Sequence, residues 1–374
     1  MKNNNTRKKV LIVFGTRPEA IKMVPLIREF EKHIDSFEVK ICVTAQHREL
    51  LDQVLNLFDI VPDYDLDIMQ KNQTLHELTS RIILEVTKVL EDISFDIVLV
   101  HGDTTTAMAS SLAAYYKQVD IGHVEAGLRS FDLYSPWPEE GNRKIITQLA
   151  KYHFVPTKYS FNNLIKENIK KNNICITGNT IIDILSQSTK FIKNNNLSFK
   201  LNTAEDKKII FVTIHRREKN LNTILHIMNA LKITINNFNN VKIYILISQN
   251  SKFNILSEEI KSIKNIFIVK SLDYYNIIIL IKKAFLIVTD SGSIQEEGSY
   301  FGKPILLLRN STDRQEVLNE NVKMVGTNTK SIVKEIELLL INKAKYNSLC
   351  KKSTIYGEGN TSKKIIKFLG ARLV

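Results

Sequence analysis

The sequence predicts an α/β protein made of two Rossmann-like domains with parallel sheets. Short, almost continuously apolar segments such as "VLIVF" at 10–14 and "IIFVT" at 209–213 alternate with amphipathic stretches along the chain. Strands that are apolar throughout and separated by helices are typical of parallel sheets covered on both faces. The alternation occurs twice, and 374 residues are enough for two such domains.

The elements follow one another in a regular order. In the first half we expect strands at 10–14, 39–44, 97–101, 121–124, 153–155 and 174–177, with helices at 48–58, 75–91, 105–116 and 140–151. In the second half we expect strands at 209–213, 242–247, 266–269, 286–289 and 305–308. The first sheet is complete near residue 178, so the predicted domains are 1–178 and 179–374. The last helix, from Thr361 onward, could pack back on the first domain.

The turn after the first strand reads "GTRPEAIK" and has features of an anion-binding site. Gly15 allows a sharp turn, and Thr16 with Glu19 three residues later is a capping-box pattern that predicts a helix start. Free N–H groups and the dipole at a helix N-terminus favour an anion, and Arg17 and Lys22 would add positive charge. An ordinary strand-to-helix turn with solvated charges is the alternative, because one glycine is a weak phosphate signature.

Acidic residues follow two further strands of the first half and open a later helix. Asp103 follows "IVLVHG", Glu125 follows "IGHV", and Glu139 lies with Arg143 in the proline-framed stretch "SPWPEEGNR". Ligands of open α/β sheets bind beyond the carboxyl ends of the strands, where these carboxylates would converge and could remove a proton from a weakly acidic carbon. Each has a structural alternative: a helix cap for Asp103, a salt-bridge partner for Glu125 and a helix-dipole residue for Glu139.

The corresponding turns of the second half carry residue types that bind phosphate and ribose. His215 follows the strand "IIFVT", and the turn "TDSGSIQEEG" can present N–H groups and hydroxyls to a phosphate. A plain N-cap is the alternative for this turn, and a buried core histidine is the alternative for His215. One predicted domain thus supplies carboxylates, and the other supplies residues that bind a nucleotide. This division predicts a nucleotide-linked substrate in the cleft between the domains. The candidate nucleotide-binding residues are Ser291, Gly292, Ser293, Glu297 and Arg314.

Composition excludes several other classes. The formal net charge is +13, but the lysines are scattered without a stripe or interleaved aromatic residues, so we expect a small anionic substrate and no nucleic acid. No apolar run approaches the roughly 20 residues of a membrane span, and the start has no signal-peptide pattern. Three isolated cysteines favour a reducing cytoplasm, and no metal or dinucleotide-cofactor motif is present.

Many of these motifs resemble those of the non-hydrolysing UDP-N-acetylglucosamine 2-epimerase family. The resemblance runs from Val10 to about Gly359. The segments that carry it are "GTRPEAIKMVPL", "TAQHRELLDQVL", "VHGDTTTAMA", "GHVEAGLRS", "YSPWPEEGNR", "TGNTIIDIL", "HRRE", "TDSGSIQEEG" and "GKPILLL".

The resemblance implies a GT-B-type arrangement, a homodimer and an isomerase without a redox cofactor. The implied reaction interconverts UDP-N-acetylglucosamine and UDP-N-acetylmannosamine by elimination of UDP to 2-acetamidoglucal and re-addition, which would supply sugars for surface polysaccharides. It implies that Asp103, Glu125 and Glu139 are the acid/base carboxylates. The resemblance does not assign removal of the C2 proton to one of the three. His215 would lie near the diphosphate and would also be catalytic. Arg17, Lys22 and Arg143 would stabilise the departing UDP, and the five second-half residues above would hold it.

Some segments depart from the family pattern and leave alternatives open. Gln46 and Arg48, a candidate effector site, are present, but 245–250 reads "ILISQN" where Pro-x-His-x-Asn-Pro is expected. The alternatives are a 2-epimerase for a modified UDP-N-acetylhexosamine, a hydrolysing relative that releases free N-acetylmannosamine, and a GT-B glycosyltransferase.

Overall fold

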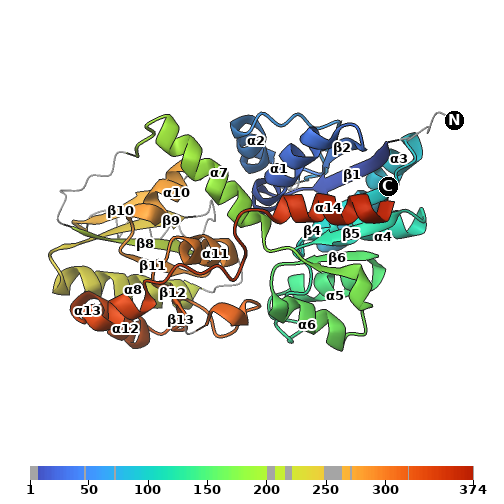
Figure 1. Cartoon of the computed structure of the whole chain (residues 1–374). Coiled ribbons are helices and arrows are strands. Elements are labelled where there is room, and N and C mark those ends of the chain that lie inside the picture. The colour runs from blue at the N-terminus through green and yellow to red at the C-terminus, as the bar shows by residue number, and fades with distance from the viewer. Residues whose placement is uncertain are drawn as a thin grey trace. The chain divides into compact units, whose positions relative to one another are not determined.

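The computed structural model divides the chain into two compact units (Figure 1). Unit 1 comprises Met1–Ser186 and Ile355–Val374, and unit 2 comprises Gln187–Thr354. The residues that the structure describes are 7–45, 48–70, 73–199, 207–214, 221–247, 263–269, 272–318 and 320–373. The functional division at residue 178 stays a prediction.

Unit 1 contains a seven-stranded sheet in the order β3-β2-β1-β4-β5-β6-β7, with every neighbouring pair parallel. The central strands are continuously buried and apolar, as in Val10–Phe14. The connection order reverses between β1 and β4, which is where ligands bind in open α/β sheets. The strands are β1 (Lys8–Phe14), β2 (Phe37–Val43), β3 (Tyr64–Asp65), β4 (Ile97–His101), β5 (Asp120–Val124), β6 (Tyr152–Val155) and β7 (Ile174–Ile176).

The helices of unit 1 include one from the end of the chain. Helix α14 (Thr361–Leu373) contacts α1 (Arg17–Phe30), and its Phe368 ring lies edge-on to Tyr152 and Phe154, with centroids 5.6 Å apart in both pairs. The other helices are α2 (Arg48–Leu57), α3 (Leu75–Asp92), α4 (Thr105–Tyr116), α5 (Glu139–Leu149) and α6 (Lys158–Lys166), with 3-10 turns η1 (Glu31–His33) and η2 (Lys171–Asn173). Helix α7 (Thr180–Asn194) begins in unit 1, and its residues from Gln187 onward belong to unit 2.

Unit 2 contains a six-stranded parallel sheet in the order β10-β9-β8-β11-β12-β13. Its core joins the strands to apolar residues of α8 and α12, including Ile227, Leu231 and Ile336. The strands are β8 (Lys208–Ile214), β9 (Val241–Ile247), β10 (Ile266–Val269), β11 (Leu286–Thr289), β12 (Ile305–Leu307) and β13 (Val322–Met324). The helices are α8 (Leu221–Asn237), α10 (Tyr274–Lys283), α11 (Gly292–Tyr300), α12 (Thr329–Ile341) and α13 (Lys343–Leu349), with the 3-10 turn η3 (Gln315–Val317).

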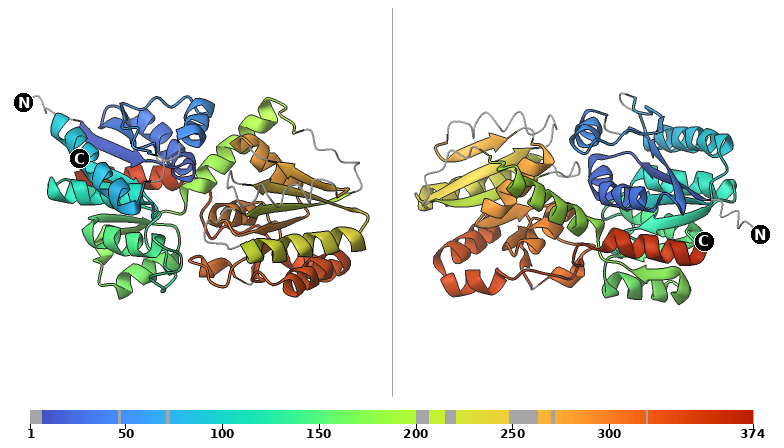
Figure 2. Two further views of the ribbon diagram at one scale, coloured as in Figure 1. Left: turned by 180° about the vertical axis from the view of Figure 1, so that it is seen from behind. Right: turned by 45° about the horizontal axis from the view of Figure 1, so that its top comes forward.

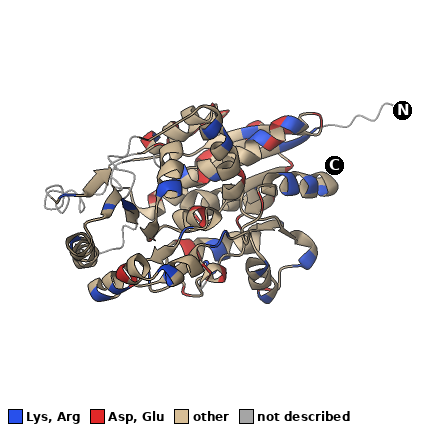
Figure 3. Ribbon diagram, turned by 60° about the vertical axis from the view of Figure 1, so that its left-hand side comes forward, with Lys and Arg blue, Asp and Glu red and all other residues tan. Residues whose placement is uncertain are grey.

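Helices cover both faces of the sheet in each unit (Figure 2). The predicted α/β class with two parallel sheets is therefore confirmed. In the described part of the chain, Lys and Arg lie on many separate elements with Asp and Glu among them (Figure 3). None of the described helices combines the length and hydropathy needed to span a bilayer.

Candidate functional site

In unit 1 the predicted site residues follow the carboxyl ends of three neighbouring strands. β1 leads into Gly15 and α1, β4 into Gly102 and Asp103, and β5 into Glu125. β4 and β5 are in register, with His101 opposite Val124, and the Gly102 N–H donates to the Val124 carbonyl at 2.9 Å. Asp103 and Glu125 therefore leave the sheet from adjacent strand ends.

The predicted capping box of α1 is present and is buried. Glu19 Oε2 accepts hydrogen bonds from the Thr16 N–H at 2.8 Å and the Thr16 hydroxyl at 2.7 Å, and from the Gly15 N–H at 3.1 Å. Its other oxygen, Oε1, accepts from the Thr104 hydroxyl at 2.7 Å. The Glu19 carboxyl thus joins the turn after β1 to the turn after β4. Burial raises the pKa of Glu19 to about 7, although these four hydrogen bonds act to lower it.

Gly15 is required by close packing. A Cβ at this position would lie 2.0 Å from Thr44 Oγ1 and 2.5 Å from Thr106 Oγ1, and these two hydroxyls are themselves hydrogen-bonded at 2.9 Å. The single glycine therefore lets the end of β2 and the start of α4 meet beside the end of β1.

Glu125 is held by buried donors in a backbone conformation that is uncommon for a side chain. Its φ angle is +63°, in the left-handed region. Lys22 Nζ and Asn179 Nδ2 both donate to Glu125 Oε2, the second at 2.6 Å, and His101 Nε2 lies 3.7 Å from the same oxygen. The side chains of Lys22 and Glu125 are only 3% and 6% exposed, so this carboxylate is paired with an ammonium group away from water.

Asp103 forms a second cation–carboxylate pair. Arg143 donates from Nε at 2.9 Å and from Nη2 at 2.5 Å to Asp103 Oδ2, and from Nη1 at 2.8 Å to Oε2 of the buried Glu140. Asn142 Nδ2 donates to the Asp103 main-chain carbonyl at 2.9 Å. The Asp103 side chain is 26% exposed, so this pair, unlike that of Glu125, is in contact with solvent.

The other predicted residues of unit 1 lie at helix starts. Glu139 is the half-buried first residue of α5, after cis peptide bonds at Ser135–Pro136 and Trp137–Pro138. Arg17 is the half-buried first residue of α1. Arg48 begins α2 and pairs with Asp65 at 2.7 Å and Asp52 at 3.2 Å. Gln46 and His215 lie outside the described residues, so an effector site and the role of His215 stay predictions.

Two buried histidines that the motifs did not single out are His123 of β5 and His153 of β6, which lie opposite each other in register. His123 Nε2 is 2.7 Å from the Gly102 carbonyl, which makes it the protonated, donating nitrogen. Burial lowers the pKa of His123 to about 3 and that of His153 to about 4, so both rings are neutral near pH 7. His123 therefore fixes the peptide that precedes Asp103.

In unit 2 the predicted Ser–Gly–Ser turn begins α11. Ser291 is the N-cap, its hydroxyl accepts from the Ile294 N–H at 3.5 Å, and its own N–H donates to Thr289 Oγ1 at 3.0 Å. A Cβ at Gly292 would lie 2.6 Å from Arg314 Nη1, so the guanidinium group lies directly against this glycine. Ser293 is half-buried in the first turn.

Arg314 is placed by carboxylates that sequence reasoning missed. It donates from Nε to Glu296 Oε1 at 2.6 Å and from Nη1 to Asp313 Oδ2 at 2.7 Å, and both carboxylates are buried. Arg309 lies beside them and donates to the Asp290 carbonyl at 2.6 Å. Glu297, the predicted ribose ligand, is 3% exposed one turn into α11. The structure thus brings the predicted residues 291–293 and 314 together.

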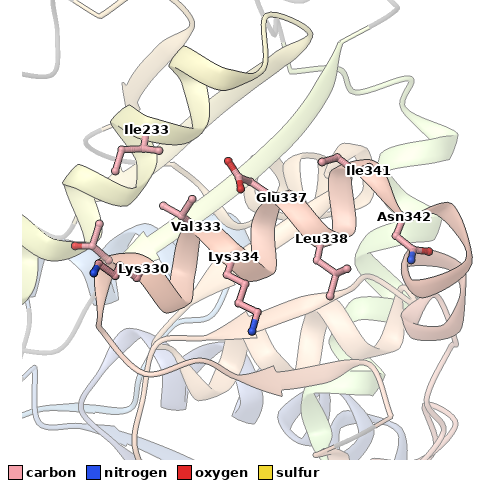
Figure 4. Close-up of a pocket in the computed structure, with 9 residues that line it drawn as sticks. Ile233, Lys330, Val333, Lys334, Glu337, Leu338, Ile341 and Asn342 are labelled. Carbon is pink, nitrogen blue, oxygen red and sulfur yellow. The ribbon is translucent and has the colours of Figure 1, made fainter.

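The groove in Figure 4 is a different surface of unit 2. It has a volume of about 600 Å³ and lies between α8 and α12, with none of the predicted site residues in its lining. The lining is Ile233, Thr329, Lys330, Val333, Lys334, Glu337, Leu338, Ile341 and Asn342. Across the described ranges, no group of three or more His, Cys, Asp and Glu side chains is placed to hold a metal ion.

Comparison with known proteins identifies the family. The family profile described as UDP-N-acetylglucosamine 2-epimerase matches residues 28–370. UDP-N-acetylglucosamine 2-epimerase of Campylobacter jejuni is 45% identical over 378 residues, covering 97% of each chain.

Two solved structures agree with these sequence matches. The UDP-GlcNAc 2-epimerase of Neisseria meningitidis bound to UDP-GlcNAc is 42% identical with a TM-score of 0.93, covering 96% of this chain and 99% of that one. The Methanocaldococcus jannaschii enzyme in complex with UDP-GlcNAc and UDP is 31% identical with a TM-score of 0.86, covering 97% and 99%. The chain belongs to the UDP-N-acetylglucosamine 2-epimerase family.

Proposed function

We propose that this protein is a UDP-N-acetylglucosamine 2-epimerase that interconverts UDP-N-acetylglucosamine and UDP-N-acetylmannosamine. Its family membership supports this reaction, as do the relatives solved with UDP-GlcNAc and with UDP. In the forward direction the C2–H bond breaks and its electron pair forms the C1=C2 bond. UDP leaves with the electron pair of the C1–O bond. Return of a proton to the other face of C2 and re-addition of UDP at C1 give the epimer.

The observation that carries this proposal is the pair of carboxylate–cation contacts at adjacent strand ends of unit 1. Lys22 holds Glu125, and Arg143 holds Asp103. A C2–H bond is only weakly acidic, so a base must be positioned against it while negative charge on the departing diphosphate is stabilised. We assign the proton transfers to the set Asp103, Glu125 and Glu139, with the nearby cations stabilising the charge that develops.

We assign UDP binding to the start of α11 in unit 2. The free N–H groups of this helix and the Arg314 guanidinium beside Gly292 suit a diphosphate. Ser291 and Ser293 add hydroxyls, and Glu297 would accept hydrogen bonds from the ribose. No redox cofactor takes part in this mechanism, because a proton and UDP leave and a proton and UDP are added back, with no net oxidation or reduction.

Incubation of the protein with UDP-N-acetylglucosamine in D₂O tests the proposal. We expect deuterium at C2 of both epimers without an added cofactor, measured by NMR. Absence of exchange with every UDP-N-acetylhexosamine tried would refute the proposed function. Release of free N-acetylmannosamine and UDP would instead identify a hydrolysing enzyme. Exchange confined to a sugar altered at C3, C4 or C6 would identify a modified substrate.

Carboxamide variants test the assignment of the carboxylates. We expect Asp103→Asn and Glu125→Gln each to bind UDP like the wild type and to lose most turnover, because the acceptor for a proton is removed while the shape is kept. Calorimetry with UDP and the exchange assay measure these two properties separately. We also propose, from family membership alone, that the protein is a homodimer, which sedimentation analysis would measure.

A further inference from the structure

Asn179 connects Glu125 to the segments by which the chain leaves and re-enters unit 1. Its Nδ2 donates to Glu125 Oε2 at 2.6 Å, and its main-chain N–H donates to the Tyr356 carbonyl at 2.7 Å. Its Oδ1 accepts from the Ile181 N–H at 3.0 Å, and its carbonyl accepts from the Ile182 N–H at 3.0 Å. Asn179 is 2% exposed, so these contacts are shielded from water.

The two segments pack tightly on each other around Asn179. Gly178 has a φ of +91°, and a Cβ there would lie 2.8 Å from both the Tyr356 carbonyl oxygen and Thr361 Oγ1. Asp183 Oδ1 and Oδ2 accept from the N–H groups of Thr361 and Ser362 at 3.0 and 2.7 Å. We call residues 177–183 and 356–362 the junction. The junction holds the Asn179 backbone in place from two sides.

Two partners of the Asn179 side chain determine the orientation of its amide. Ile181 presents an N–H, which requires the amide oxygen, and Glu125 presents a carboxylate oxygen, which is matched by the NH₂ group. With the amide reversed, its NH₂ group would face the Ile181 N–H and its oxygen would face the Glu125 carboxylate, so neither hydrogen bond could form. Asn179 is therefore a fixed donor whose direction does not change with protonation, and it meets the same oxygen as Lys22.

We propose that Asn179 is a positioning residue for Glu125, holding that carboxylate in its reactive orientation by anchoring it to the junction. This inference rests on the proposed function, in which Glu125 takes part in proton transfer. The Glu125 backbone is in the left-handed region, and Lys22 and Asn179 both donate to the Oε2 atom of its side chain. Lys22 is carried by α1 and Asn179 by the junction, so two elements distant in sequence fix one oxygen.

Asn179→Asp tests the inference, because Asp keeps the shape and the acceptor for Ile181 but replaces the donor that faces Glu125. We expect kcat to fall by about 10-fold to 100-fold with KM for UDP-N-acetylglucosamine within about twofold. A second carboxylate beside Glu125 raises the pKa values of the pair, so the acid limb of the kcat/KM profile should move upward by roughly one pH unit or more. Steady-state kinetics and C2 exchange in D₂O between pH 6 and 9 measure both effects.

Asp183→Asn is the matched control. It weakens the same junction at the start of α14 but keeps the Asn179 donor that faces Glu125, so we expect a lower melting temperature, a smaller loss of kcat than in Asn179→Asp and an unchanged acid limb. An equal loss of kcat in Asp183→Asn and Asn179→Asp would show that junction stability alone is responsible and would overturn the inference.

The remaining outcomes separate this inference from the proposed function. Wild-type kcat and pH profile in Asn179→Asp would overturn the positioning role. If that variant does not fold, Asn179→Ala takes its place, with the same expected fall in kcat at unchanged UDP affinity and the same refuting result. Absence of C2 exchange by the wild-type protein would overturn the proposed function itself.

Discussion

Glu19→Gln should remove a pH-dependent loss of stability that the wild-type protein has between about pH 4.5 and pH 7. Burial raises the pKa of Glu19 from 4.5 to about 7, so the folded state retains the Glu19 proton over this range while the unfolded state releases it. The stability that comes from the protonated carboxyl is complete below pH 4.5 and is lost as the pH rises through about 7. Gln resembles the protonated group in shape and charge and does not titrate.

The magnitude follows from the pKa shift. At roughly 1.4 kcal/mol per pKa unit, the change from 4.5 to about 7 corresponds to a fall of about 3–4 kcal/mol in the free energy of unfolding. The conversion applies here because Glu19 is only 2% exposed and its partners are hydroxyl and N–H groups. The difference in the free energy of unfolding between Glu19→Gln and the wild type should therefore change by about this amount between pH 4.5 and pH 7.

Urea denaturation at pH 5, 6, 7 and 8 measures this difference. Glu77→Gln is the matched control, because Glu77 closes an equivalent capping box with Thr74 at the start of α3 but is exposed. The pKa of Glu77 is lowered, chiefly by its hydrogen bonds with Thr74, which is the direction opposite to that of Glu19, so the stability difference between Glu77→Gln and wild type should not show the change with rising pH expected for Glu19→Gln. A constant difference between Glu19→Gln and wild type from pH 5 to pH 8 would refute the reasoning.

Three further predictions follow from close contacts and burial. Gly15→Ala should lower the free energy of unfolding by about 1–3 kcal/mol, because its Cβ would overlap Thr44; an unchanged urea midpoint would contradict this. Gly292→Ala should keep the fold but weaken UDP binding by about tenfold, since the methyl group displaces the Arg314 guanidinium; calorimetry with an unchanged Kd would disprove it. His123→Gln should remove part of the acid sensitivity below pH 6.5: the wild type, whose folded His123 has a pKa of about 3, loses up to about 1.4 kcal/mol per pH unit as its unfolded state becomes protonated. Parallel stability curves for variant and wild type between pH 7 and pH 5 would exclude that contribution.

The sequence was sufficient to predict those helices and strands that are marked by residues close together in the chain. Strands such as β4 are continuous runs of buried apolar residues, and Thr16 with Glu19 marks the start of α1 within four positions. The edge strands β3 and β13 were missed because β3 is only two residues long and β13 reads Val–Lys–Met, whereas the predicted strands β7 and β12 are as short as β13 but apolar throughout. Their pairing is decided by the neighbouring strand.

The partners of the site residues could be predicted less well than the residues themselves. The bond between Glu19 and Thr104 joins positions 85 residues apart, and that between Asn179 and Glu125 joins positions 54 apart. No local pattern in a single sequence encodes such a pair. Glu140 offered one usable signal, because it lies three positions before Arg143 on a helix, the spacing at which opposite charges meet. The steric need for glycine at position 15 could not be predicted either, because it comes from the Thr44 and Thr106 hydroxyls, which lie where a Cβ would be.

The placement of α14 in unit 1 has a consequence for folding of the protein during its synthesis on the ribosome. Its buried residues Ile365, Ile366 and Leu369 belong to a unit whose first segment ends at Ser186, and all of unit 2 is translated in between. While unit 2 is being synthesised, the surface of unit 1 that α14 will cover therefore stays exposed. This prolongs the time in which chaperones can bind it and in which it can aggregate. Completion of this unit depends on a segment that is synthesised after all of unit 2, so truncation of the chain before residue 361 would destabilise the part of the molecule that is made first.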